Sequence, residues 1–322
     1  MFTTITAVRA SIPDATRIAW EKTGRRLLHL RLSLTGASGE QKRKLERRLR
    51  GREQYHKLQQ ADAVVVSFGK SGRTWLRVMM SRLYQQKYQL PDRAVIGFGN
   101  FHRMATTIPK IFFTHDNYIA DYTGHADSKV DFYGKKVVLM VRDPRDVAIS
   151  QFFQWKYRMR PHKKSLNHYP EHDADVSIYD FIAHKANGIP GVVNFMNVWA
   201  REIPNLENVL VVRYEDLRSD PHKVLQRLAD FLEIPSTQTD IEDAVDFASY
   251  DNMKKLEGSN GFLLGGGRLM PKDRNNPDSF KVRRAKVGGY RDYLEDDQIE
   301  HIDRLVNETL DPIFEYSSQR DS

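Results

Sequence analysis

The chain has 322 residues, no cysteine and a formal net charge of +8. This length suits one large α/β core, and the lack of cysteine excludes disulfides and thiolate metal sites. No apolar run approaches the roughly 20 residues that span a bilayer. The first residues also lack a continuous apolar segment that could serve as a signal, so we expect a cytoplasmic protein.

The positive charge is concentrated at the N-terminal end. Residues 1–60 hold 14 Lys and Arg against five Asp and Glu, a net of +9, which leaves the other 262 residues near −1. We therefore divide the chain into a basic extension, 1–60, and a domain, 61–322. A nearly neutral domain argues against binding of nucleic acid. The extension is expected to be a solvated arm or a surface for anionic lipid or polymer, which would place the protein peripherally at a membrane.

Four short apolar runs predict the strands of one sheet: residues 63–66, 111–114, 137–141 and 209–212. Helix signals follow them, such as the Asp-Pro pairs at 143–144 and 220–221, which suit an N-cap and a first helical position. Residues 296–310 predict a closing helix. This alternation predicts an α/β fold with a mostly parallel sheet, helices on both faces and a ligand at the carboxyl ends of the strands.

A glycine-rich turn follows the first run and indicates a site for a phosphate or sulfate ester. Gly69 and Gly72 loosen the backbone before a helix with an apolar face that begins near Arg73. Backbone amides at a helix N-terminus favour an anion, and Lys70 and Arg73 add two positive charges there. A Walker A loop requires glycine where Val64 stands, so the turn fits a nucleoside-triphosphate kinase poorly.

Residues 69–76, GKSGRTWL, resemble the phosphosulfate loop P-K-S-G-T-T-W-L of sulfotransferases, with Gly69 for the usual Pro and Arg73 for the first Thr. Residues 142–150 resemble the family's R-[ND]-P-x-D-x-x-x-S, and residues 283–290 stand where it carries R-K-G and G-D-W. The resemblance spans about residues 61–295. It implies a P-loop-like fold of the sulfotransferase type and transfer of a sulfuryl group from 3′-phosphoadenosine 5′-phosphosulfate (PAPS) to a hydroxyl or amine, leaving PAP.

The same resemblance implies that thirteen residues contact the donor: Lys70, Ser71, Gly72, Arg73, Thr74, Trp75, Arg142, Ser150, Tyr214, Tyr250, Arg283, Arg284 and Ala285. In the family, Lys70 would neutralise charge on the bridging oxygen, Arg142 and Ser150 would contact the 3′-phosphate, and the aromatic residues would flank adenine. Ser150 could instead bond back to the carbonyl of Asp146, and either Tyr could be a core residue. Alanine at 285 in place of glycine puts its amide contact in question, because φ > 0 strains alanine.

His115 falls where the family carries its catalytic base, in K-T-H, with Phe113 in place of the Lys. Arg73 is the candidate to restore the missing charge. His suits a general base because its usual pKa lies near the working pH. The adjacent Asp116 either orients the ring or is itself the base. The resemblance calls for no metal.

Two alternatives stay open: a nucleotide-dependent kinase and a non-catalytic protein that binds PAPS or PAP. The acceptor is not defined, and a saccharide, a lipid and a small metabolite are all candidates. A polar insertion with His162, His168, Tyr169 and His172 could meet a sugar or a lipid headgroup. The sequence leaves the oligomeric state open.

Overall fold

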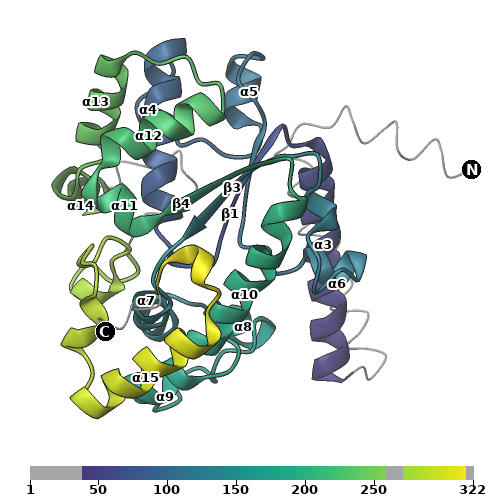
Figure 1. The fold of residues 1–322 in the computed structure, drawn as a ribbon, viewed down its shortest axis with the longest axis vertical. Coiled ribbons are helices and arrows are strands. Elements are labelled where there is room, and N and C mark those ends of the chain that lie inside the picture. Colours follow the sequence, from purple (N-terminus) through teal and green to yellow (C-terminus); the bar gives the residue numbers. More distant parts are fainter. Residues whose placement is uncertain (1–37, 259–270, 317–322) are drawn as a thin grey trace, which may run out of the picture.

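The computed structural model describes residues 38–258 and 271–316 and contains a four-stranded sheet in the order β2-β1-β3-β4 (Figure 1). All three pairings are parallel, and each predicted run forms a strand that is at most two residues longer than expected. The strands are β1 (Ala63–Ser67), β2 (Ile111–Thr114), β3 (Lys136–Val141) and β4 (Asn208–Arg213). The predicted parallel sheet is therefore confirmed.

Helices cover both faces of the sheet, as the alternating pattern predicts. The α-helices are α3 (Gly39–Gln60), α4 (Arg73–Tyr88), α5 (Asn100–Met104), α6 (Ile119–Thr123), α7 (Pro144–Tyr157), α8 (Pro161–Leu166), α9 (Ile178–Ala183), α10 (Ile189–Glu202), α11 (Tyr214–Ser219), α12 (Pro221–Phe231), α13 (Gln238–Phe247), α14 (Tyr250–Gly258) and α15 (Asp296–Thr309). Short 3-10 helices are η1 (Val130–Phe132), η2 (Ile203–Asn205), η4 (Pro277–Ser279), η5 (Gly289–Asp292) and η6 (Pro312–Phe314). Helices α4, α12 and α13 lie on one face, and α7, α10 and α15 on the other.

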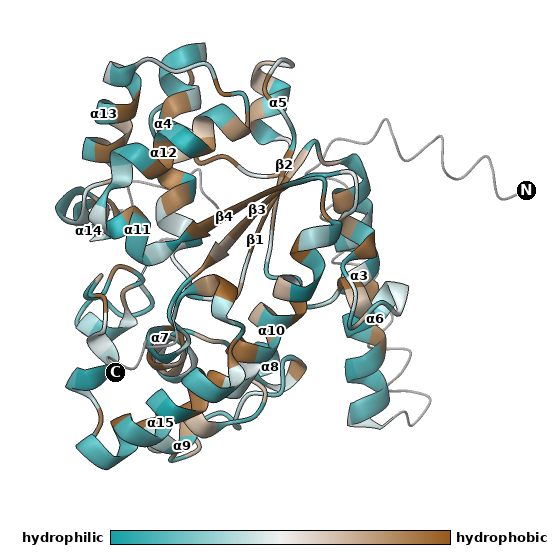
Figure 2. Ribbon diagram, in the orientation of Figure 1, coloured by the Kyte–Doolittle hydropathy of each residue, from teal (hydrophilic) through white to brown (hydrophobic). Residues whose placement is uncertain are grey.

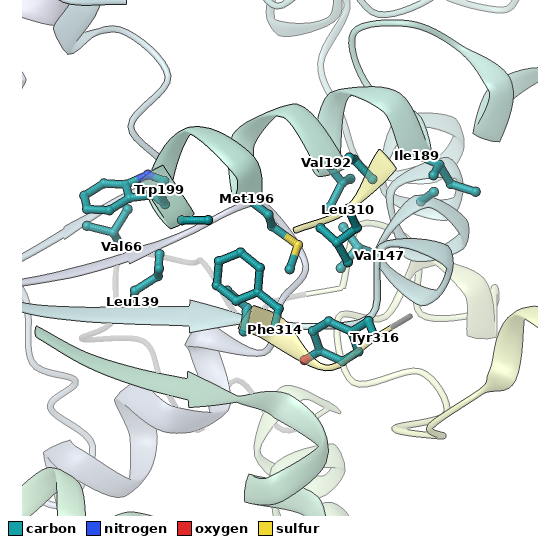
Figure 3. Close-up of a cluster of buried hydrophobic side chains, with 14 of the residues drawn as sticks. Val66, Leu139, Val147, Ile189, Val192, Met196, Trp199, Leu310, Phe314 and Tyr316 are labelled. Atoms are coloured by element: carbon teal, nitrogen blue, oxygen red, sulfur yellow. The ribbon is translucent and has the colours of Figure 1, made fainter. Parts of the chain in front are cut away.

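Alternate side chains of the strands enter two hydrophobic cores, so the middle of each strand is apolar (Figure 2). Val65 belongs to the core under α4 and α12. Val66 belongs to the other core, where Figure 3 shows it with Met196 and Trp199 of α10 and with Phe314 near the chain end. Burial of both faces leaves the carboxyl ends of the strands as the place where polar groups can gather.

The Asp-Pro signals start the two helices that they predict. The side chain of Asp143 accepts a hydrogen bond from the amide of Arg145, with Pro144 as the first residue of α7. Asp220 caps α12 in the same way. The start of α7 is therefore fixed directly after β3, and this geometry sets the position of the residues on its first two turns.

Helix α3 departs from the expected solvated arm, because residues 39–60 pack on the domain. It opens with a capping box between Ser38 and Gln41, and Leu58 is fully buried in the core. Gly51 packs so closely on the backbone of Tyr118 that a Cβ would collide with it. These contacts come from a glycine and one leucine, which a search for an apolar stripe does not detect. Residues 1–37, including the basic segment 20–34, lie outside the described residues.

None of the described helices combines the length and apolar character needed to cross a bilayer.

We predict that Leu58→Ala destabilises the domain by about 2 to 5 kcal/mol, because a fully buried leucine leaves a cavity. Urea unfolding followed by circular dichroism measures this change. Arg48→Ala is the control, since Arg48 is exposed on the same helix and should change the free energy of unfolding by less than about 0.5 kcal/mol. Equal stability of the Leu58 variant and the wild type would return α3 to the status of a solvated arm.

Candidate functional site

A cavity of about 570 Å³ opens at the carboxyl ends of the strands. Each strand delivers a lining residue within one position of its end: Phe68 after β1, His115 after β2, Arg142 after β3 and Tyr214 after β4. Side chains that are far apart in the sequence therefore meet at one edge of the sheet, as expected for ligand binding in an open α/β fold.

The predicted phosphate loop connects β1 to α4 along the wall of this cavity. Gly72 has φ of 94°, and a Cβ there would lie 2.5 Å from the ring of Tyr214. Glycine also provides no side-chain cap for the first amides of α4, and within the backbone the amide of Trp75 donates to the carbonyl of Gly72 at 2.8 Å. Gly69, in place of proline, accepts a hydrogen bond at 3.0 Å from the buried amide of Gln151. The loop therefore keeps the conformation of an anion cradle.

Twelve of the thirteen residues predicted to contact the donor line the cavity, and so does His115. Ser71 is the exception, because its side chain is only 2% exposed and lies beneath the loop. The roles assigned to these residues stay predictions, but the structure brings their side chains to one place.

Arg142 and Ser150 approach the cavity from the end of β3 and from the second turn of α7. Arg142 stacks on Tyr214 with its Cζ 4.2 Å from the ring centroid, and its Nε is buried with no hydrogen-bond partner among the described residues. The hydroxyl of Ser150 makes no hydrogen bond within the described part of the chain, so it is not bonded back to Asp146. Both groups retain donors for a ligand.

Asp146 joins two of the predicted motifs. Its Oδ2 accepts from Nη2 of Arg142 at 3.1 Å and from the amide of Gly288 at 3.0 Å, and its Oδ1 accepts from the amide of Tyr290 at 3.0 Å. The first turn of α7 thus fixes the glycine segment that follows the basic residues 283–286.

The basic residues of this segment are held by neighbouring polar groups. Arg283 donates to the hydroxyl of Tyr293 at 2.6 Å, and Arg284 pairs with Asp292 at 3.0 Å. Ala285 has φ of 51°. The backbone therefore adopts the left-handed conformation that the family's glycine would allow, at a cost of order 1 to 2 kcal/mol for alanine.

Glu257 supports this segment and was not found by the sequence analysis. It is fully buried, accepts from the amides of Lys281 at 2.6 Å and Val282 at 2.9 Å, and pairs with Arg158 at 3.4 Å. Arg158 also donates to the carbonyl of Ser279. A glutamate near a helix end resembles any surface glutamate in the sequence, and only its distant partners identify it.

Three aromatic residues border the side of the cavity near α11 and α14. The rings of Trp75 and Tyr214 meet edge to face, with centroids 6.1 Å apart. The indole nitrogen of Trp75 donates to the carbonyl of Ala248 at 2.7 Å, and the hydroxyl of Tyr250 donates to the carbonyl of Arg283 at 2.9 Å. These bonds fix flat apolar surfaces of the kind that flank a purine ring.

His115 is held at both ring nitrogens. Its Nδ1 lies 2.8 Å from the carbonyl oxygen of Ser67, and its Nε2 lies 2.8 Å from Nη2 of Arg73. A carbonyl only accepts and a guanidinium only donates, so the imidazole is neutral, with its proton on Nδ1 and a lone pair on Nε2. Burial, and then the charge of Arg73, lowers the pKa of His115 well below its usual range.

Asp116 is engaged elsewhere. Its buried carboxylate lies 2.9 Å from Nζ of Lys129, which in turn is 5.5 Å from the ring centroid of Trp199. Burial raises the pKa of Asp116, against the opposing effect of Lys129. The described partners of the His115 ring are Ser67 and Arg73, whereas the carboxylate of Asp116 belongs to an interior ion pair with Lys129.

Of the four side chains in the polar insertion that could meet an acceptor, two line the cavity. His168 and Tyr169 line the cavity, whereas His162 pairs with α3 and His172 contacts Lys164. The sequence does not show which of the four side chains line the cavity, because their placement depends on how α8 packs.

Comparisons with known proteins agree with this geometry. A family model described as a sulfotransferase domain matches residues 60–313. The chain belongs to the sulfotransferase family. Cytosolic sulfotransferase 15 of Arabidopsis thaliana is 25% identical over 77% of this chain and 72% of its own length. Flavonol 4′-sulfotransferase of Flaveria chlorifolia is 25% identical over 80% of this chain and 82% of its own. The solved structure of a mouse sulfotransferase complexed with PAP matches 84% of this chain and 90% of the mouse chain, with a TM-score of 0.51 and 20% sequence identity. This likeness shows a shared fold.

As a member of this family the protein is a sulfotransferase enzyme, and PAPS is its sulfuryl donor. The predicted fold type and family resemblance are confirmed. The two alternatives, a kinase and a non-catalytic binding protein, are set aside. Val64 lies in the middle of β1 and not in a loop, which agrees with the absence of a Walker A motif.

The residues around the cavity fit such a donor. The buried Nε of Arg142 has no partner in the described ranges, and the uncapped start of α4 offers backbone amides. Burial, and then the charges of Arg158, Arg142 and Arg283, lowers the pKa of Lys70 to about 7. Such a crowded set of cations is stabilised by an anion. Among residues 38–258 and 271–316 no cluster of His, Asp or Glu could hold a metal ion.

We predict that binding of PAP at pH 8 is accompanied by proton uptake. Lys70 is then mostly neutral in the free enzyme, because its pKa is about 7, and the phosphates of PAP should raise that pKa so that Lys70 becomes charged. At pH 6 Lys70 is already protonated, so its contribution should vanish. Calorimetric titration in buffers of different ionisation enthalpy measures the protons taken up.

Lys70→Arg is the matched control for this experiment, because arginine stays protonated at both pH values. Its titration at pH 8 should lack the proton uptake of the wild type. The same uptake in both proteins would assign the effect to another group.

Proposed function

We propose that this sulfotransferase transfers the sulfuryl group of PAPS to a hydroxyl of a small acceptor, with His115 as general base and Lys70 beside the leaving oxygen. The arrangement of His115 carries this proposal. Its Nδ1 proton is bound to Ser67, its lone pair is on Nε2 at the cavity wall, and its lowered pKa keeps the ring neutral at pH 7. A base in this state can accept a proton without losing one first.

The transfer requires one proton acceptor and one stabilising cation. When bound, PAPS supplies the sulfuryl group and a phosphate as leaving group. Nε2 of His115 takes the proton of the acceptor hydroxyl while that oxygen forms its bond to sulfur. The bond from sulfur to the bridging phosphate oxygen breaks, and the charge left there is stabilised by Lys70 and by the amides at the start of α4.

We further propose that the enzyme acts in the cytosol. Support comes from relatives such as cytosolic sulfotransferase 15 of Arabidopsis thaliana. The basic extension remains a candidate for contact with an anionic membrane or polymer. Because α3 belongs to the folded domain, a truncation that tests this contact should remove residues 1–37 alone. Independence from nucleic acid also stays a prediction.

Selection for the 3′-phosphate is expected to depend on Arg142 and Ser150. Ser150→Ala removes a hydroxyl that makes no hydrogen bond within the described chain, so PAP should bind more weakly by about 0.5 to 1.5 kcal/mol. Loss of the charge-assisted donor in Arg142→Ala should cost about 1.5 to 3 kcal/mol. Titration calorimetry with PAP and with adenosine 5′-phosphate, which lacks the 3′-phosphate, checks both values. If either variant weakens the two ligands equally, that residue does not read the 3′-phosphate.

His115→Ala should lower kcat by roughly 10² to 10⁴-fold and leave the affinity for PAP nearly unchanged, because only proton transfer is lost. Asp116→Asn should instead reduce stability, since it leaves the buried Lys129 without its counter-charge. Initial rates with PAPS and urea unfolding separate the two effects. Normal turnover in His115→Ala together with collapse in folded Asp116→Asn would move the role of base to Asp116.

The pH dependence should differ from that of an unperturbed histidine. Because burial and the charge of Arg73 lower the pKa of His115, kcat/KM should rise well below pH 6.5 if His115 is the base. Burial raises the pKa of Asp116 toward that of a histidine, so the profile alone does not distinguish the two bases. Arg73→Thr removes the charge beside the ring, so the rise should shift to higher pH if His115 is the base. An unchanged profile in this variant would contradict that assignment.

A further inference from the structure

A buried ion pair lies behind the basic residues that border the cavity. Glu257, in the last turn of α14, is fully buried, and its carboxylate pairs with Arg158 at 3.4 Å. Neither of these two side chains lines the cavity. Taking a carboxylate and a guanidinium out of water is unfavourable, and an apolar pair of the same size often stabilises a fold equally well. A carboxylate at this place therefore calls for a role other than packing.

The carboxylate of Glu257 binds two consecutive backbone amides with its two oxygens. Its Oε1 accepts from the amide of Lys281 at 2.6 Å, and its Oε2 accepts from the amide of Val282 at 2.9 Å. A glutamine side chain has only one acceptor oxygen, and its NH₂ group would face a second N–H donor here. The site therefore requires a carboxylate and not merely a polar side chain of this size.

The two amides come directly before Arg283, which is predicted to contact the donor. The carbonyl of Arg283 accepts from the hydroxyl of Tyr250 at 2.9 Å, and Tyr250 is the first residue of α14. Two side chains of one helix thus hold the backbone of three successive residues, 281–283. The guanidinium of Arg283 lies over the ring of Phe153, with its Cζ 3.6 Å from the ring centroid. The direction in which this side chain leaves the backbone is therefore fixed from α14.

Helix α14 is in turn placed relative to the phosphate loop. The indole nitrogen of Trp75, on the first turn of α4, donates at 2.7 Å to the carbonyl of Ala248, two residues before α14 begins. On the other side, Arg158 follows the last residue of α7 and donates to the carbonyl of Ser279. Glu257 lies where α14, the end of α7 and residues 279–282 meet. Its carboxylate thus sets the position of the basic segment relative to the rest of the donor site.

We propose that Glu257 is a positioning residue for the sulfuryl donor, which holds the backbone of residues 281–282 so that Arg283 meets the donor in the required orientation. Its side chain is buried behind the cavity wall and acts through the backbone. The inference rests on the predicted contact of Arg283 with the donor. It assigns to Glu257 an effect on donor binding and none on the proton transfer proposed for His115.

A double-mutant cycle measures whether Glu257 acts through Arg283. Arg283→Ala alone should weaken PAP binding by about 10-fold or more, because one charge-assisted contact is lost. In Glu257→Gln, where Arg283 is no longer held in place, the same substitution should weaken binding by less than about 3-fold. Calorimetric titration with PAP gives the four dissociation constants. Equal factors in the two backgrounds, or unchanged PAP binding by Arg283→Ala, would overturn the proposal.

Two control variants separate positioning from a general loosening of the domain. Ser150→Ala acts on the donor site from α7, so it should weaken PAP binding by the same factor with and without Glu257. Asp251→Asn makes the same change from carboxylate to amide at an exposed position of α14, and it should leave PAP affinity unchanged. Coupling of Glu257 to Ser150 as strong as its coupling to Arg283 would show a general structural role and overturn the proposal.

Adenosine 5′-phosphate, which lacks the 3′-phosphate of PAP, provides a second readout. If Glu257 acts through Arg283, Glu257→Gln and Arg283→Ala should change the ratio of the affinities for PAP and adenosine 5′-phosphate in the same direction. Opposite changes in this ratio would contradict the proposal. Both ligands bind without an acceptor, so the result does not depend on the identity of the base, and failure of the proposed function is detected separately by the turnover of His115→Ala.

The stability of the variant is checked first, because Glu257→Gln leaves the buried Arg158 without its counter-charge. Circular dichroism at the temperature of the titration shows whether the protein is folded. If it is not, Arg158→Gln/Glu257→Gln, which removes both charges together, replaces it in the cycle with the same expected factors. Unfolding of both variants would show that the carboxylate is needed for the fold itself and would overturn the positioning role.

Discussion

The buried carboxylate of Asp146 joins three segments on the donor side of the cavity. It lies in the first turn of α7, where a negative charge is favoured by the helix dipole. From there it accepts bonds from Arg142 and from the amides of Gly288 and Tyr290. The end of β3, the start of α7 and the C-terminal glycine segment are therefore fixed relative to one another. Arg142 also donates directly to the carbonyl of Lys286 at 3.0 Å, so this bond and the carboxylate of Asp146 together join the two basic motifs.

This arrangement acts on Lys70. Burial disfavours its charged form, and the charges of Arg158, Arg142 and Arg283 add to this effect, so its pKa falls to about 7. The fold tolerates these neighbouring positive charges because Arg142 is paired with Asp146 and Arg158 is paired with Glu257. The electrostatic field is thus set before a ligand arrives, and a preorganised field of this kind stabilises charge that develops during a reaction.

The sequence predicted the sheet well because the strands have an unusually simple environment. Helices cover both faces, so each strand is a continuous apolar run, and aspartate followed by proline marks two helix starts. Two of the donor motifs, residues 69–76 and 142–150, are equally local, since each follows a strand. For these elements the information lies within a few residues.

The features that were missed depend on contacts between distant segments. Helix α3 has a mean polarity that suggests solvent, yet Gly51 and Leu58 are buried by residues far along the chain. Glu257 acts through the amides of residues 281–282, and Lys163 and Lys281 line one cavity although they are 118 positions apart in the chain. No periodicity or local motif encodes such meetings, so this part of the cavity lining could not be predicted.

Two departures from the family pattern are best understood as one change. The ring of Phe113, at the position of the family's lysine, lies 4.3 Å from the guanidinium of Arg77 and does not line the cavity. The positive charge near the base comes instead from Arg73, which donates to the carbonyl of Thr114 and contacts Nε2 of His115. The cation has moved from the strand that carries the base to the helix that begins at the phosphate loop.

This relocation couples the two halves of the site. Arg73 is the first residue of α4, at the predicted anion site, and its guanidinium contacts Nε2 of His115, the lone pair that the proposed base would use. One side chain therefore connects the phosphate loop with the imidazole, and its positive charge contributes to the lowered pKa of His115.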